Sequence, residues 1–140
     1  MIATVLPVLA SCGGGQQGTE EKAAQLLNEA RAALASQQYG QARSSILRLR
    51  RQYPTALEAR RAAILTLDSV EMLEARDSVA IYEPVLAEAR ERLSTLADNP
   101  RGTADSTYIA QRILVYQLEE RYDALCTKVK FFERKLKEDR

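Results

Sequence analysis

Apolar residues recur at alternating intervals of three and four through the second half of the chain. The first series contains one polar member and comprises Leu65, Asp68, Met72, Ala75, Val79, Tyr82, Leu86, Ala89, Leu93 and Leu96. The second series comprises Tyr108, Gln111, Val115, Leu118, Tyr122, Leu125, Val129, Phe132 and Leu136. This spacing is the heptad period of a coiled coil. We therefore predict two long helices separated by a turn at 98–106.

The segment between the two series has the composition of a turn. It reads Asp98-Asn99-Pro100-Arg101-Gly102-Thr103, and Asp105 or Ser106 is suited to cap the next helix. Two heptad helices joined by a short turn should fold back on each other, which predicts an antiparallel coiled-coil hairpin over 65–138. Pro84 lies inside the first helix, where it removes a backbone hydrogen bond, so we expect a kink or a break near it. Gln111 lies close to the turn, where we expect water to reach it.

The first half of the chain contains two shorter segments with helical spacing. Thr19 followed by two acids is a typical helix start, and the apolar spacing after it predicts a helix over 20–37. A second helix is predicted over 40–52, ended by Pro54. The following Thr55-Ala56-Leu57-Glu58 has the spacing of a capping box, in which the threonine accepts from the third helical residue and the glutamate reaches back.

These two helices resemble one tetratricopeptide repeat. The resemblance rests on small, aromatic and turn-forming positions, namely Ala30, Tyr39, Ala42, Ile46 and Pro54. It covers about Ala23 to Pro54, and Gln37 replaces the usual turn glycine. The Tyr53-Pro54 ending is similar to the divergent repeats of outer-membrane-assembly lipoproteins. The resemblance implies a tetratricopeptide-like helical base over 20–64, capped by the next helix because one repeat cannot bury its apolar face alone. A plain helical hairpin is the alternative.

Composition supports an all-α fold and limits the chemistry. Glycine occurs after residue 18 only at Gly40 and Gly102, and no segment alternates with the period of a strand. The chain has no histidine, and Cys126 is its only cysteine besides Cys12. The absence of histidine excludes nucleophile–histidine pairs and histidine metal ligands. The sequence also has no glycine-rich phosphate loop. We predict a non-enzymatic protein with no catalytic, cofactor-binding or metal-binding residue and no cofactor.

The N-terminus carries a candidate membrane anchor. Leu9-Ala10-Ser11-Cys12 follows an apolar run and resembles the lipobox of bacterial lipoproteins. The resemblance implies that a signal peptide over 1–11 is removed, that Cys12 is the lipid-attachment residue, and that the Gly/Gln-rich segment 12–19 is a flexible tether. Residues 1–11 lack the basic residue of an ordinary signal peptide, which a true start a few codons upstream would explain. In the lipoproteins that this segment resembles, an aspartate after the cysteine favours the inner membrane, so Gly13 implies the outer membrane of the bacterial cell envelope.

Charge is unevenly distributed although the formal net charge is +1. Six arginines share Glu58 as their local counter-charge: Arg43, Arg48, Arg50, Arg51, Arg60 and Arg61. Acids dominate the following segment, namely Asp68, Glu71, Glu74, Asp77, Glu83 and Glu88. We interpret the arginines as a candidate partner-binding basic patch for an acidic protein or lipid headgroups. The alternative is that the basic and acidic segments neutralise each other or are solvated faces.

These features together predict a membrane-anchored bacterial lipoprotein that acts as a non-enzymatic protein-binding scaffold or adaptor. Its partners would be a protein of unknown identity and the membrane, through the N-terminal lipid anchor. The near-neutral net charge disfavours a nucleic-acid partner. One alternative is a coiled-coil chaperone or cell-envelope tether. Another is a cytoplasmic helical interaction protein with a coincidental lipobox.

Overall fold

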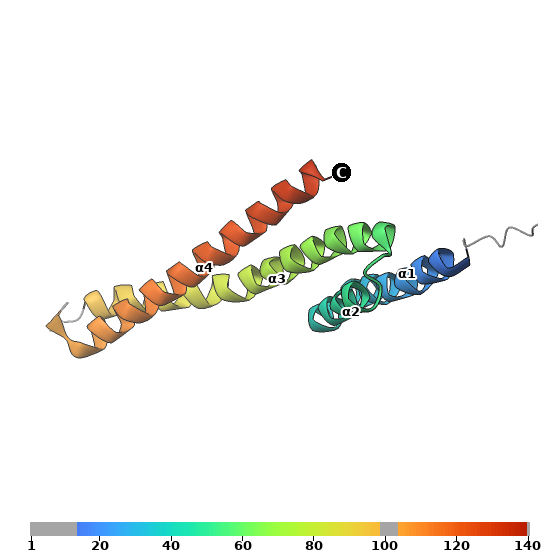
Figure 1. Cartoon of the computed structure of the whole chain (residues 1–140). Coiled ribbons are helices and arrows are strands. Elements are labelled where there is room, and N and C mark those ends of the chain that lie inside the picture. Colours follow the sequence, from blue (N-terminus) through green and yellow to red (C-terminus); the bar gives the residue numbers. More distant parts are fainter. Residues whose placement is uncertain (1–13, 99–103, 140) are drawn as a thin grey trace, which may run out of the picture. The chain divides into compact units, whose positions relative to one another are not determined.

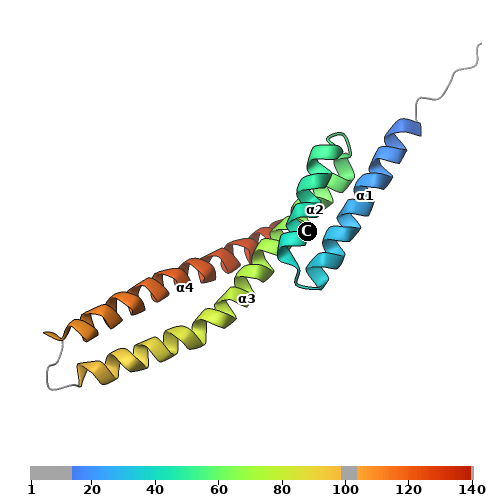
Figure 2. The same ribbon diagram turned by 90° about the horizontal axis from the view of Figure 1, so that it is seen from below.

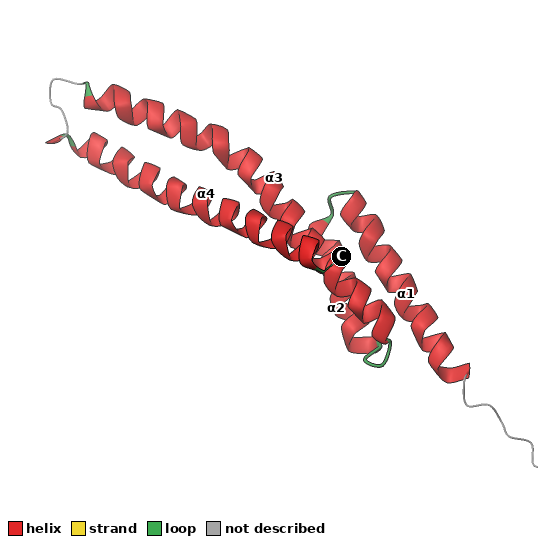
Figure 3. Cartoon of the chain, turned by 90° about the horizontal axis from the view of Figure 1, so that it is seen from above, coloured by secondary structure: helices red, strands yellow, loops and turns green. Residues whose placement is uncertain are grey.

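The protein is all-α in the computed structural model, which describes residues 14–98 and 104–139 (Figure 1). Its helices are α1 (Gly14–Ala35), α2 (Tyr39–Gln52), α3 (Leu57–Ala97) and α4 (Ser106–Glu138), and no strand occurs in the described ranges (Figure 3). The predicted fold class is therefore confirmed. Contacts divide the chain into two compact units, with unit 1 ending at Thr66 and unit 2 beginning at Leu67, so α3 contributes to both.

Unit 1 is built on small buried residues. Buried positions recur at helical spacing on each of its three helices: Ala23, Leu26, Leu27, Ala30 and Ala33 on α1, Ala42, Ser45, Ile46 and Leu49 on α2, and Ala59 and Ala63 on α3. Alanine leaves little side chain between helices, so the backbones can approach closely. Ala30, Ala42 and Ile46 are completely buried. These three belong to the positions that carry the repeat resemblance.

The turn between α1 and α2 is a helix-ending motif that normally contains glycine. Gln37 adopts a φ of 58°, in the left-handed region. Gln38 N donates to Ala33 O at 2.8 Å and Gln37 N donates to Leu34 O at 2.9 Å. This pair of bonds is the Schellman arrangement, which satisfies carbonyls left open at the end of a helix. Gln37 therefore adopts a backbone conformation that glycine accommodates most easily, although it carries a side chain.

Two local expectations for unit 1 are wrong. α1 begins at Gly14, so residues 14–19 of the expected flexible tether are helical. α3 begins at Leu57, which places Thr55 too early to cap it. The acceptor for the first turn of α3 is instead the carboxylate of Glu20, which lies 3.4 Å from Glu58 N and 3.3 Å from Ala59 N.

In unit 2, α4 lies beside the C-terminal part of α3 and runs antiparallel to it (Figures 2 and 3). Leu86, Ala89 and Val115 form a buried cluster, and partly buried hydrophobic residues pack against it: Leu93, Leu118 and Tyr122. The members of this cluster from both helices belong to the two heptad series. At the start of α4, Asp105 accepts a hydrogen bond from Thr107 N at 2.8 Å, which confirms the predicted cap.

The structure corrects or resolves two further expectations in unit 2. α3 continues through Pro84, so this proline does not break the helix. Gln111 is buried rather than reached by water, and its Nε2 donates to Ala89 O at 2.9 Å. The polar residue in the second heptad series is thus accommodated by a bond across the hairpin.

Candidate interaction surfaces

The anchor residues lie outside the described part of the chain. The signal-peptide segment 1–11 and Cys12 are among the residues left undescribed, so the lipobox assignment remains a prediction. Cys12 precedes the first residue of α1 by two positions in the sequence. Within the described ranges, no helix has an apolar stretch long enough to cross a membrane.

The structure distributes the six arginines over different sides of unit 1. Arg48 faces α1, where its Nη1 lies 4.0 Å from Glu29 Oε2. Arg43 is half-buried, and helical geometry places it about 140° around α2 from Arg48. The predicted counter-charge was Glu58 alone, and Glu29 of α1 was overlooked because it is remote in sequence. Arg43 and Arg48 therefore do not share one surface.

The other four arginines lie on either side of the turn between α2 and α3. Arg50 and Arg51 occupy the last turn of α2, where positive charge favourably meets the helix dipole. Arg60 lies in the first turns of α3 and donates through Nη1 to Pro54 O, across the turn. Arg61 follows it and is exposed, and Leu57 is 66% exposed. We call the set Arg50, Arg51, Leu57, Arg60 and Arg61 the α2–α3 corner.

Ion pairs of both polarities join α3 to α4, and two acids of α3 take part in them. Across the hairpin the ion pairs are Asp68 with Lys135, Glu71 with Lys128, Arg76 with Glu133, and Arg90 with Glu119. The members of each pair lie at similar distances from the turn, as an antiparallel hairpin requires. The expected acidic arm is therefore partly balanced by Lys128 and Lys135 of the following helix.

Asp68 is the most buried charged member of these pairs. Its side chain is 7% exposed, whereas that of Lys135 is 37% exposed. Lys135 Nζ lies 2.9 Å from Oδ1 and 2.8 Å from Oδ2, but only the contact to Oδ1 has hydrogen-bond geometry. The ammonium group thus approaches both oxygens, and one buried oxygen is held by charge alone.

An apolar stripe follows the outer face of α4. It consists of Ile109, Ile113 and Tyr116, which are 49%, 53% and 65% exposed. Ile113 lies about 160° around the helix from the buried Val115, so the stripe faces away from α3. The heptad pattern identifies only the inner face of this helix, so the stripe was not predicted. Its spacing of four and three was nevertheless present in the sequence.

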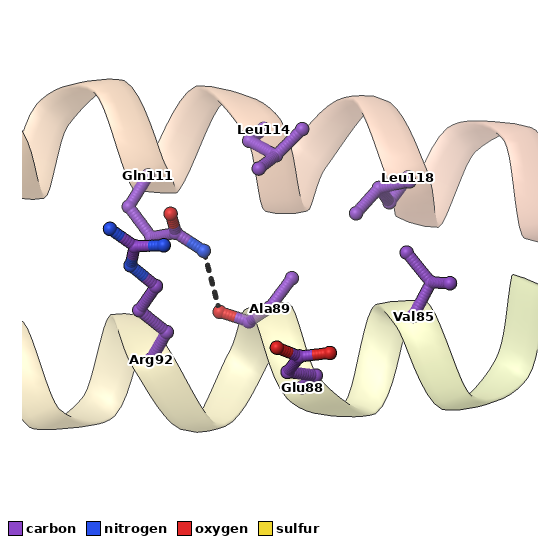
Figure 4. Close-up of a pocket in the computed structure, with 7 residues that line it drawn as sticks. All are labelled: Val85, Glu88, Ala89, Arg92, Gln111, Leu114 and Leu118. Atoms are coloured by element: carbon purple, nitrogen blue, oxygen red, sulfur yellow. Dashed lines mark hydrogen bonds between the residues drawn. The ribbon is translucent and has the colours of Figure 1, made fainter.

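A groove also runs along one side of the hairpin (Figure 4). Val85 of α3 and Leu114 and Leu118 of α4 give it apolar walls, while Glu88 and Arg92 add charge. Its volume is about 240 Å³, and the bond from Gln111 to Ala89 crosses between the helices beside it. The groove can accommodate an apolar side chain, but it has no convergent set of polar groups for chemistry.

The described residues show no cluster with evident catalytic geometry. No group of three or more His, Cys, Asp or Glu is placed to hold a metal within these ranges. Cys126 is a free, half-buried thiol. Its hydrogen bond and charge raise the pKa of Tyr122, with a further contribution from Glu83 of α3. This interaction concerns two neighbouring side chains and forms no pocket.

Comparison with protein-family models, curated proteins and solved structures gives no match for this chain.

Proposed function

We propose that the protein is a lipid-anchored scaffold of the bacterial cell envelope that binds a partner protein and performs no catalysis. The observation that carries the binding role is the outer stripe of α4. Three large apolar side chains are about half exposed or more on one face of a helix whose opposite face is already packed. Exposed apolar side chains gathered in this way mark contact sites for other proteins.

Several features support the architecture within this proposal. The burial of Ala30, Ala42 and Ile46 between helices is what a tetratricopeptide-like base would require. The antiparallel pairing of α3 with α4 supports a coiled-coil arm over 65–138. In this proposal unit 1 follows the anchor in the chain and unit 2 carries the binding stripe.

A photocrosslinking amino acid at Ile113 tests the partner-binding role in cells. We expect a discrete adduct with one protein, because Ile113 is the middle residue of the stripe. Arg121 is the matched control, since it is exposed on the same helix but lies about 80° around it from Ile113. Adducts of equal yield from both positions would refute the stripe as the binding face. A broad ladder of adducts from Ile113 would instead indicate a chaperone that grips many clients.

The lipid anchor has a separate test. Cys12→Ala should abolish incorporation of labelled fatty acid and release the protein from the membrane fraction. Cys126→Ala is the matched control, because it removes the other cysteine and should leave both properties unchanged. Continued sedimentation of the Cys12→Ala protein with membranes, or no label in the wild type, would contradict an anchor at Cys12.

A further inference from the structure

The α2–α3 corner lies at the end of unit 1 where α1 begins. α1 and α2 are antiparallel, and Glu20 near the start of α1 contacts the first turn of α3. The start of α1, the end of α2 and the start of α3 therefore share one end of the unit (Figures 2 and 3). Glu20 is six residues from Gly14, or about 9 Å along the helix. The corner is thus close to the point where the chain continues toward Cys12.

The corner has cationic groups available to a ligand. Among the described residues, Arg50, Arg51 and Arg61 take part in no ion pair, and all three are exposed. The bond from Arg60 to Pro54 O holds that guanidinium across the turn and leaves further N–H donors unused. Acids also lie at this end, namely Glu58, Glu20 and the adjacent Glu21, and the carboxylate of Glu20 accepts from two backbone N–H groups. Positive charge therefore prevails at this end of the unit.

The type of cation also points to a ligand class. Every basic residue between 39 and 64 is arginine, whereas α4 carries several lysines in its C-terminal half. Arginine presents a planar set of donors that matches phosphate oxygens, and lysine does not. Leu57 adds an exposed aliphatic side chain among the guanidinium groups. Basic side chains mixed with exposed aliphatic ones are typical of helices that bind at a lipid surface.

We propose that the α2–α3 corner binds the phosphate headgroups of an anionic phospholipid surface. The inference rests on the proposed anchor at Cys12, which would bring this end of unit 1 to the membrane. Near an anionic membrane surface, each basic side chain adds to the attraction. The corner would then hold unit 1 against the bilayer.

The test uses the full chain carrying Cys12→Ala, so that no acyl group contributes to binding. Sedimentation is compared with vesicles of phosphatidylcholine alone and with vesicles that also contain phosphatidylglycerol. We expect binding to the anionic vesicles only, reduced by added salt because the attraction is electrostatic. Arg50→Gln with Arg61→Gln should weaken binding about 30-fold, since each basic residue near an anionic surface contributes about fivefold.

The control variant is Arg121→Gln with Arg134→Gln, which removes the same charge from exposed positions of α4. It should bind like the parent chain. Equal weakening in both double variants would overturn the proposal, as would equal binding to both kinds of vesicle or none to either. Displacement by inorganic phosphate at equal headgroup concentration would assign the site to free phosphate and also overturn it. Single Arg61→Gln provides a milder variant should the double one fold poorly.

Labelling with fatty acid separates this proposal from the anchor. If Cys12 takes up label but the Cys12→Ala chain ignores anionic vesicles, the corner fails and the anchor stands. If the vesicles bind through the corner while Cys12 takes up no label, the anchor fails and the lipid-binding surface stands.

Discussion

Glu20 caps a helix that begins far along the chain, because its Oε2 accepts from Ala59 N at 3.3 Å across 39 residues. The first N–H groups of a helix have no partner within that helix. A carboxylate there satisfies them and interacts favourably with the positive end of the helix dipole. One side chain of α1 therefore caps the start of α3 and joins these two helices.

Glu20→Ala should lower the free energy of unfolding by about 1 kcal/mol, the usual cost of losing a helix cap. Urea titration monitored by circular dichroism measures the change. Glu21→Ala is the control, because Glu21 is exposed on the same helix and a surface substitution there should stay within about 0.5 kcal/mol. A loss of the same size from both variants would show that the bonds to α3 contribute nothing.

Gln37→Gly should stabilise the protein, in spite of glycine's greater freedom in the unfolded chain. A side chain in the left-handed region costs about 1 to 2 kcal/mol, and the φ of 58° at Gln37 lies there. Glycine removes this cost, and part of the gain is offset by unfolded-state entropy. We expect a net gain of up to about 1 kcal/mol in the same titration. Gln38→Gly, at the adjacent residue with φ of −86°, should instead be neutral or destabilising.

The fold class and the pairing of the long helices could be predicted because the signals are local and repeated. Leu86 and Val115 belong to series that set the buried face of each helix, and Asp105 lies directly before the helix it caps. The cap supplied by Glu20 could not be predicted, since it joins residues remote in sequence. Thr55 had the correct spacing for a local cap, but α3 begins at Leu57 and this threonine does not take part.

Lys135→Met should destabilise the hairpin by about 1 to 3 kcal/mol, because it leaves the buried Asp68 carboxylate without its partner. Asp68→Leu combined with Lys135→Met should recover most of the loss, since a buried ion pair can often be replaced by apolar residues without cost. A double-mutant cycle measured by thermal melting gives the coupling. The comparison pair is Arg76 with Glu133, whose side chains are 57% and 38% exposed, and its coupling should stay below about 1 kcal/mol.

Gln111→Glu should destabilise the hairpin by about 1 to 3 kcal/mol at neutral pH. The substitution keeps the shape but replaces the amide donor with a buried carboxylate that faces the carbonyl of Ala89. Gln111→Leu loses the same hydrogen bond without burying a charge, so its melting temperature should change much less. Equal melting of the Glu and Leu variants would mean that water reaches position 111.

The candidate surfaces were harder to predict than the helices. The six arginines were predicted to form one patch because they are close together in the sequence. In the structure Arg48 lies near Glu29, whereas Arg50 and Arg61 lie at the α2–α3 corner. The outer stripe was missed because the stronger inner series accounted for the apolar residues of α4. Ile113 shows that one helix can carry two apolar faces, and which of them is covered depends on the tertiary packing.

The pKa of Tyr122 reports the register of the hairpin. It is raised above 10.0, first by the hydrogen bond and charge of Cys126, one turn along α4, and then by the charge of Glu83 on α3. A negative charge beside the phenol disfavours the phenolate, so removing either charge should lower this pKa. Cys126→Ala should lower it whatever the arrangement of the helices. Glu83→Gln should lower it only if α3 returns alongside α4 in the register described.

Titration of the Tyr122 ring resonance by NMR measures both shifts in the folded protein. Glu88→Gln is the matched control, because this acid of α3 removes the same charge but is not among the groups that raise the pKa of Tyr122. If Glu83→Gln leaves the Tyr122 pKa unchanged while Cys126→Ala lowers it, Glu83 is not opposite Tyr122. If Glu88→Gln lowers it instead, α3 is displaced along α4 and the pairs of Asp68 with Lys135 and Arg90 with Glu119 must move with it.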